Sequence, residues 1–180
     1  MGNRSLGKFI ALVLRHHPER IGITLDGNGW ADVDALIEGV NGNSRYKIDR
    51  NRLEEIVRTD EKGRYSFDKT GRKIRANQGH SIPVDVELKE ALPPAVLWHG
   101  TAEKSMVSIE QKGLLPMGRL YVHLSRDADT AEKVGRRHGK PIVYRIDCKR
   151  MSEDGYRFWL SANNVWLTSE VPPQYLERIG

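Results

Sequence analysis

The sequence predicts an α+β fold divided into two parts, and three observations lead to this prediction. Apolar residues recur at helical spacing within the first 60 positions and are followed by two short alternating segments. After position 95, short apolar strands alternate with two amphipathic helices. Residues 81–95 contain several prolines and have mixed polarity, which is typical of a linker. We therefore expect an N-terminal domain at residues 1–80 and a C-terminal domain at residues 96–180.

The N-terminal domain begins with an amphipathic helix, because apolar residues fall at i, i+3, i+4, i+7 and i+8 from Leu6 to Leu14. Ser5 is placed to cap this helix, and Pro18 ends it by restricting the residue before it. Alternating apolar residues within 21–25 predict a short strand, which a GNG turn follows.

Two compact helices and a hairpin complete this domain. Asp32 and Asp49 are suited to cap helices that bury one apolar face each. Residues 65–67 and 73–76 are predicted to be strands joined by a DKTG turn. The order helix, strand, helix, helix, hairpin is that of a winged helix.

The C-terminal domain combines short strands with two helices. Gly113 is expected to end the first helix and Asp127 to open the second. The predicted elements are strands at 96–99, 121–124, 142–146, 156–160 and 165–168, and helices at 102–112 and 127–137. Strands with only two helices among them are typical of an α+β fold.

Positive charge is concentrated in one region of the chain. The net charge is +5, and six Lys or Arg lie between Lys62 and His80 against one acid, Asp68. An excess of this kind favours an anionic partner such as a nucleic acid. A solvated basic face is the simpler explanation of such a run, so the charge alone does not identify the partner.

The cysteine content and the N-terminus indicate the compartment. Only one cysteine, Cys148, is present, which excludes an intrachain disulfide and a Cys-rich zinc site. We expect it to be a buried structural thiol. The N-terminal residues lack the long apolar run of a signal or membrane-spanning segment. These features predict a cytoplasmic protein that does not bind a membrane.

Basic residues at the end of the first helix form one candidate site. Arg15 and His16 stand in its last turn, where the helix dipole favours cations, and Pro18 projects them from the helix end. This suits an anion site, although basic residues also commonly cap the last carbonyls of a helix. Arg64 precedes the hairpin and Arg75 lies on its second strand, so several guanidinium groups could share one face. Solvated surface arginines are the alternative.

Two strand ends in the C-terminal domain form the other candidate site. The LWHGT segment offers His99 and Thr101, and its glycine permits a close approach of the backbone. The YVHLS segment repeats this design with His123 and Ser125. Two such strand ends are harder to attribute to core packing than one. No HExxH, CxxC or GxSxG pattern occurs, so neither a metal site nor a Ser-His-Asp hydrolase is predicted.

Five ordered motifs across both domains resemble one family. The segments SLGKFIALVLRHHPERIGITLDGNGWADVDALI, IRANQGHS, LWHGT, GLLPMGRLYVHLS and VGRRHGKPIV match, in order, the RNA 2′-phosphotransferase family, which includes the tRNA-splicing 2′-phosphotransferase and its bacterial relatives. The resemblance covers essentially the whole chain. It implies an N-terminal winged-helix lobe and a C-terminal lobe of the ADP-ribosyltransferase fold that binds NAD.

The resemblance also implies a reaction in two steps. An internal RNA 2′-phosphate attacks the nicotinamide-bearing ribose carbon of NAD and expels nicotinamide. The ribose 2″-hydroxyl then attacks phosphorus, which leaves RNA with a 2′-hydroxyl and releases ADP-ribose 1″,2″-cyclic phosphate. RNA with an internal 2′-phosphate and NAD as co-substrate are therefore the expected partners. We expect a monomer that needs no metal.

Roles for individual residues follow from the same resemblance. The residues that match the NAD-binding motifs are His99, Gly100, Thr101, His123, Leu124 and Ser125, with Val165 in a third motif. The residues that match the phosphate-binding arginines are Arg15, Arg64 and Arg137, and the catalytic histidine corresponds to His16. Arg137 is chosen over Arg136 because it directly precedes the HGKP segment.

The third motif departs from the wider ADP-ribosyltransferase fold. Many of those enzymes carry a glutamate there, whereas this chain has Asn163, Asn164 and Val165. An anionic acceptor makes that glutamate dispensable, because a carboxylate would repel the incoming phosphate. Glu170 lies close by in the sequence, which leaves the point open.

Two alternatives come from other classes of protein. An ADP-ribosyltransferase that modifies protein or nucleic-acid termini would share the NAD site but would not need Arg15 and His16. A winged-helix protein that only binds nucleic acid would explain the first domain and the basic run. It would leave LWHGT and YVHLS unexplained.

Overall fold

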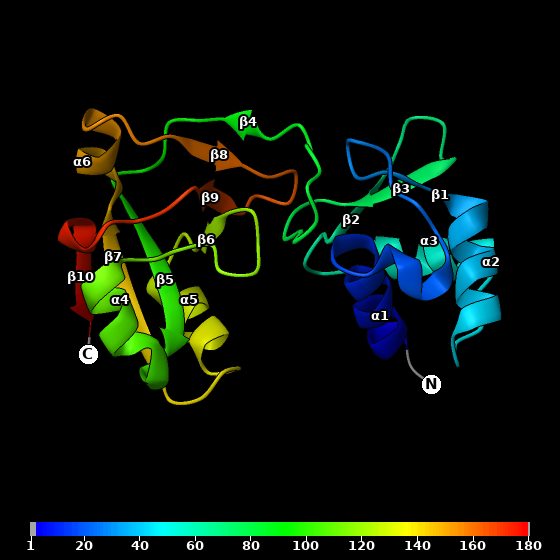
Figure 1. Cartoon of the computed structure of the whole chain (residues 1–180), viewed down its shortest axis with the longest axis horizontal. Coiled ribbons are helices and arrows are strands. Elements are labelled where there is room, and N and C mark those ends of the chain that lie inside the picture. Colours follow the sequence, from blue (N-terminus) through cyan, green and yellow to red (C-terminus); the bar gives the residue numbers. More distant parts are fainter. Residues whose placement is uncertain (1–2, 180) are drawn as a thin grey trace. The chain divides into compact units, whose positions relative to one another are not determined.

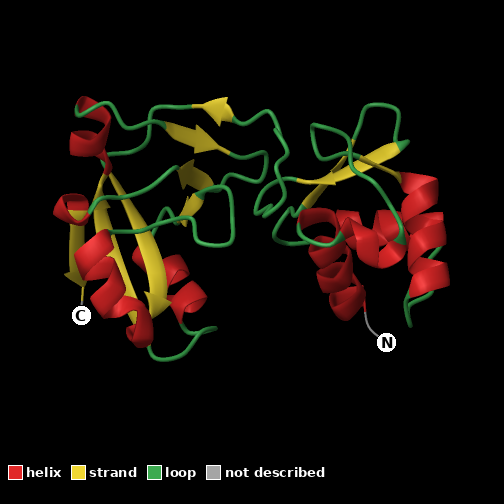
Figure 2. Ribbon diagram, viewed as in Figure 1, coloured by secondary structure: helices red, strands yellow, loops and turns green. Residues whose placement is uncertain are grey.

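The chain folds into two compact units. A computed structural model describes residues 3–179, and contacts divide the chain into unit 1, which ends at Glu87, and unit 2, which begins at Leu88 (Figure 1). Of the segment 81–95, Ser81 to Glu87 therefore belong to unit 1 and Leu88 to Ala95 to unit 2. The units are a mixture of helices and small antiparallel sheets, which agrees with the predicted α+β class (Figure 2).

Unit 1 combines three helices with a small sheet. The strands pair in the order β1-β3-β2, all antiparallel. The elements are α1 (Asn3–Arg15), the 3-10 helix η1 (Pro18–Ile21), β1 (Ala31–Asp32), α2 (Val33–Asn43), α3 (Arg50–Arg58), β2 (Tyr65–Phe67) and β3 (Lys73–Ala76). Both strands of the predicted hairpin are confirmed at their predicted bounds.

The helices of unit 1 form where apolar spacing and a capping residue coincide. The apolar face of α1 is fully buried, through Leu6, Ile10, Val13 and Leu14. The side chain of Asp32 accepts a hydrogen bond from the Ala35 amide at 2.9 Å, and Asp49 caps α3 in the same way. The cap predicted at Ser5 is wrong, because α1 already begins at Asn3.

The strand predicted within residues 21–25 is also wrong. Pro18 opens η1 there, and Gly22 follows with φ of +71°. Ile21 and Ile23 are buried and Gly22 between them is exposed, as the alternation indicates. No neighbouring strand pairs with this segment within the described residues, so it packs into the core without joining a sheet.

Unit 2 contains two antiparallel sheets. Their strand orders are β10-β7-β5 and β4-β8-β9-β6. The elements are β4 (Lys89–Glu90), β5 (Val96–Ala102), η2 (Glu103–Ser105), α4 (Met106–Lys112), β6 (Val122–Leu124), α5 (Ala128–Gly135), β7 (Pro141–Asp147), α6 (Cys148–Glu153), β8 (Phe158–Leu160), β9 (Trp166–Thr168), η3 (Pro173–Tyr175) and β10 (Leu176–Ile179).

Close packing of α5 against β5 fixes the centre of unit 2. Strands β5 and β7 pair from Val96↔Asp147 to Ala102↔Pro141. A Cβ built on Gly100 would lie 1.6 Å from the Ala131 carbonyl oxygen, so only glycine fits at this crossing. The helix backbone therefore lies directly on the strand that carries LWHGT.

The burial of Cys148 and the lengths of the helices bear on the predicted buried thiol and on membrane spans. Cys148 is fully buried, as expected, and burial raises the pKa of its thiol to about 12. Between residues 3 and 179, no helix combines the length and apolar character needed to cross a membrane.

Candidate active site

The C-terminal end of α1 and the QGHS segment meet in unit 1. The Ser81 amide donates to the Arg15 carbonyl oxygen at 3.0 Å, and the Ser81 hydroxyl oxygen lies 2.9 Å from Nδ1 of His16. Gly79 has φ of +89°, and a Cβ built on it would lie 3.5 Å from Cζ of Arg15. The two motifs are therefore in direct contact although 65 positions separate His16 from Ser81.

Arg64 pairs with an acid of unit 1, and its charge acts on the same buried tyrosine as that of Arg15. The carboxylate of Asp60 accepts hydrogen bonds from both the amide and the guanidinium group of Arg64, and the two side chains are 8% and 22% exposed. Burial raises the pKa of Tyr65 to about 12, and the charges of Arg64 and Arg15 both oppose that rise. Both guanidinium groups thus lie within electrostatic reach of one buried phenol.

His80 is a site neighbour that the sequence analysis did not select. It is 2% exposed, and none of residues 3–179 gives its Nε2 a hydrogen-bond partner. Burial, followed by the charges of Arg15, His16 and Arg75, lowers the pKa of His80 to about 4. His80 is therefore neutral at pH 7. His80 lies between Gly79 and Ser81, which contact Arg15 and His16. The signal for His80 in the sequence was its place in the IRANQGHS motif.

We expect His80 to make the protein less stable in mild acid. In the unfolded chain its pKa returns to about 6.5. Its contribution to the free energy of unfolding is therefore fully present above pH 6.5 and falls as the pH drops towards 4, by about 3 kcal/mol in all. Urea unfolding at pH 7.0, 5.5 and 4.5 measures this. His80→Asn should show a flatter pH dependence, and equal slopes for the two proteins would contradict the assignment.

Acids of unit 1 pair with three members of the basic run at residues 62–80, namely Arg64, Lys73 and Arg75. Lys73 contacts Asp26 at 2.9 Å, and Arg75 contacts Glu87 at 3.0 Å. The guanidinium carbon of Arg75 also lies 4.3 Å from the centre of the Trp30 ring. Arg75 is thus held on the sheet by an aromatic ring and a carboxylate, and it is not a solvated surface arginine.

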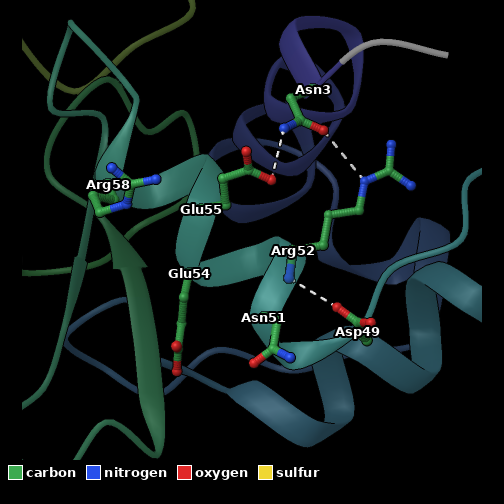
Figure 3. A pocket seen from close by; sticks show the side chains of 7 residues that line it. All are labelled: Asn3, Asp49, Asn51, Arg52, Glu54, Glu55 and Arg58. Atoms are coloured by element: carbon green, nitrogen blue, oxygen red, sulfur yellow. Dashed lines mark hydrogen bonds between the residues drawn. The ribbon is translucent and has the colours of Figure 1, made fainter.

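A pocket on unit 1 lies over α3 and the start of α1 (Figure 3). Its lining has mixed charge and is internally bonded: Asn3 contacts Glu55 at 3.2 Å and Arg52 at 3.3 Å. The lining residues are Asn3, Asp49, Asn51, Arg52, Glu54, Glu55 and Arg58. None of the predicted site residues belongs to it, and its charges give an anion no net attraction.

In unit 2, the middle of β5 and the end of β6 bring the two histidine motifs together. The strand end predicted after His99 is wrong, because β5 continues to Ala102. Trp98 and Ser125 exchange backbone hydrogen bonds of 2.9 and 2.7 Å. This bridge places Nδ1 of His99 3.0 Å from the carbonyl oxygen of His123. Since a carbonyl oxygen only accepts, Nδ1 of His99 carries the proton. The Nδ1 of His123 lies 3.0 Å from the Tyr121 carbonyl oxygen, which fixes that ring similarly.

His99 is held in its neutral form. Burial lowers its pKa. The hydrogen bond to the His123 carbonyl oxygen opposes this shift, and the charge of Arg119 adds to it. A neutral imidazole with its proton on Nδ1 offers Nε2 as a hydrogen-bond acceptor, which suits a hydroxyl group of a ligand. Arg119 is a second residue that the sequence analysis missed, although it lies within the quoted segment GLLPMGRLYVHLS.

The other residues that match the NAD-binding motifs lie on or next to β5, β6 and β9. A Cβ on Gly135 would lie 2.6 Å from the Thr101 carbonyl oxygen, so α5 approaches Thr101 as closely as it approaches Gly100. Leu124 pairs with Trp166, the residue after Val165. The Val165 amide donates to the Ser161 hydroxyl at 2.9 Å, in a tight turn where Asn164 has φ of +60°.

Arg137 lies two residues after the C-terminal end of α5 and is exposed. Within residues 3–179 its side chain makes no hydrogen bond or ion pair, whereas its neighbour Arg136 pairs with Glu132 at 2.7 Å. Arg137 thus belongs to unit 2, while Arg15, His16 and Arg64 lie in unit 1. Glu170 is exposed, two residues after β9. Over the described residues, no three His, Cys, Asp or Glu side chains are grouped to hold a metal ion.

Comparison with known proteins identifies relatives over the whole length. Residues 2–170 match the family model described as RNA 2′-phosphotransferase, Tpt1 / KptA family. A protein of Fusobacterium nucleatum named probable RNA 2′-phosphotransferase is 50% identical over 173 residues, which cover 96% of each chain. Proteins of the same name from Nostoc punctiforme and Hahella chejuensis are each 49% identical, over 97% and 98% of this chain and 96% and 94% of theirs. The chain therefore belongs to the RNA 2′-phosphotransferase, Tpt1 / KptA family.

Proposed function

We propose that the protein removes an internal 2′-phosphate from RNA, with NAD as co-substrate, and leaves a 2′-hydroxyl. Nicotinamide and ADP-ribose 1″,2″-cyclic phosphate are the other products. In this proposal unit 1 is a winged-helix lobe and unit 2 an ADP-ribosyltransferase-like lobe. The observation that carries it is the Trp98–Ser125 bridge, because it joins the two histidine motifs at one place. Family membership supports the RNA substrate.

The residues of unit 2 fit a dinucleotide. Nε2 of His99 is suited to accept a hydrogen bond from a ribose hydroxyl, and Thr101 on β5 and Ser125 after β6 add hydroxyl donors and acceptors. Arg119 provides a positive charge beside His99, which suits a pyrophosphate. When bound, NAD supplies an electrophilic ribose carbon and nicotinamide as its leaving group.

The residues of unit 1 fit a phosphate. Arg15 and Arg64 offer planar guanidinium forks that match phosphate oxygens. His16, held at Nδ1 by Ser81, is an acid or base for the second step. The first step needs no base, because the attacking phosphate is already ionised. Arg137, exposed in unit 2, is proposed as a further phosphate ligand.

The test is an RNA with one internal 2′-phosphate, incubated with and without NAD in the presence of a metal chelator. We expect loss of the 2′-phosphate only when NAD is present, and mass spectrometry should detect nicotinamide and the cyclic phosphate. Inorganic phosphate as the product would overturn the proposal. Nicotinamide release with the 2′-phosphate retained would instead indicate ADP-ribosyl transfer to protein or to nucleic-acid termini.

Two histidine variants, one test and one control, are compared in the same assay. His99→Ala should slow nicotinamide release and leave RNA binding intact, because His99 belongs to unit 2. His138→Ala removes an exposed histidine of the same unit and should leave both unchanged. Equal loss of RNA affinity and nicotinamide release in His99→Ala would argue against separate binding sites.

A further inference from the structure

A contact at the C-terminal end of α1, between His16 and Ser81, points to a role for Ser81 in the reaction. The helix ends at Arg15, so His16 lies just outside it, partly exposed and with its ring centroid 6.3 Å from that of His17. Proton transfer requires the imidazole to be held in one orientation. A hydrogen bond that orients the ring joins His16 Nδ1 and the Ser81 hydroxyl, at 2.9 Å.

Ser81 is itself fixed to the helix that it serves. Its amide donates at 3.0 Å to the carbonyl oxygen of Arg15, one of the carbonyls that a helix end leaves without an intrahelical donor. The residue before it, His80, is 2% exposed, which anchors the segment in the core. The hydroxyl therefore reaches His16 from a backbone that is bonded to α1, although Ser81 is exposed to solvent.

The chemistry of this contact decides how His16 presents its ring. A serine hydroxyl either donates to Nδ1 or accepts from it, and in both cases Nδ1 is engaged. We infer that Ser81 is a positioning residue for His16: it holds the ring and leaves proton exchange with the substrate to Nε2. This inference rests on the proposed function.

The proton balance of the second step fits one imidazole nitrogen. The attacking ribose hydroxyl loses a proton as its oxygen bonds to phosphorus. The bond between phosphorus and the RNA 2′-oxygen breaks, and that oxygen gains a proton. One nitrogen can therefore accept the first proton and deliver the second, and it ends the step as it began. A ring held at Nδ1 can do this without turning over.

The first test compares Ser81→Ala with Ser81→Thr in single-turnover reactions. Loss of one orienting hydrogen bond should slow the second step about tenfold in Ser81→Ala, while nicotinamide release keeps its rate. Ser81→Thr keeps the hydroxyl and should stay within about twofold of the unchanged protein. Ser44→Ala, which removes a hydroxyl bonded to Val40 at the end of α2, should have no effect. Equal slowing by alanine and threonine, or no slowing by alanine, would overturn the inference.

The second test asks whether Ser81 acts through His16. In a His16→Ala background, Ser81→Ala should cause no further slowing, and a full additional tenfold loss would show that Ser81 acts independently. Nitrogen-15 spectra of the His16 ring report the contact without any substrate, and Ser81→Ala should shift the Nδ1 resonance. An unchanged resonance would overturn the inference. A shifted resonance in a protein that does not use NAD would show that the proposed function, rather than the contact, had failed.

Discussion

Gly100→Ala is expected to unfold unit 2 at temperatures where the unchanged protein is folded. The new Cβ would lie 1.6 Å from a backbone oxygen of α5, at Ala131, and backbone cannot move aside as a side chain can. Overpacking of this severity costs about 3 kcal/mol or more. For a unit of this size, the midpoint of thermal unfolding should fall by more than about 10 °C.

Circular dichroism and tryptophan fluorescence measure this loss, since Trp98, Trp159 and Trp166 all lie in unit 2. Gly118→Ala is the matched control: a Cβ there meets nothing within 4 Å, and the midpoint should stay unchanged. A Gly100→Ala protein that melts normally but fails to bind NAD would show that this glycine serves the ligand and not the packing.

His16→Ala is expected to stop the reaction halfway. Loss of one preorganised group in the second step costs about 10²–10³ in rate, whereas the first step needs no proton transfer. RNA that still carries ADP-ribose on its 2′-phosphate should therefore accumulate. A denaturing gel of a single-turnover reaction resolves this species. Arrest before nicotinamide release, with no such band, would remove His16 from the second step.

Arg64 needs a more careful substitution for the same test. Its guanidinium group pairs with Asp60, which is only 8% exposed, so Arg64→Ala would leave a nearly buried charge uncompensated at a cost of about 3–5 kcal/mol. Arg64→Lys keeps the charge but not the planar fork, and it should accumulate the same intermediate.

Arg137 is tested together with its neighbour Arg136 as a matched pair. Arg137→Ala should slow the second step, and Arg136→Ala, which removes the partner of Glu132, should not. The reverse result would transfer the role to Arg136.

Local signals account for the parts of the fold that the sequence predicts well. A cap at Asp32, Asp49 or Asp127 is formed within three residues, so it is visible without the tertiary structure. The strand at 21–25 failed because alternating burial does not require a partner strand. Strand β10 was missed because it lies at a sheet edge with mostly exposed residues, so no apolar alternation marks it.

In the candidate sites, too, the sequence predicted the chemically reactive residues but not the groups that orient them. The motifs selected Arg15, His16 and the two histidine strand ends, because their residue types are chemically suggestive. The groups that orient them are visible only in space: Ser81 holds the His16 ring across 65 positions, and the Trp98–Ser125 bridge joins LWHGT to YVHLS. Composition likewise concealed the acids that pair with the basic run, since these come from other segments.

The contacts of residues 81–87 define the smallest N-terminal fragment that is worth expressing alone. Asp85 donates through its amide to the Gly27 carbonyl oxygen at 2.9 Å, and Val86 is 9% exposed. A fragment that stops at residue 80 would lose these contacts, the Glu87 partner of Arg75 and the hydroxyl beside His16. One that ends at Glu87 keeps all the residues of unit 1 that are proposed to bind the phosphate or to orient His16. The usable boundary therefore lies after Glu87, well inside the proline-containing segment.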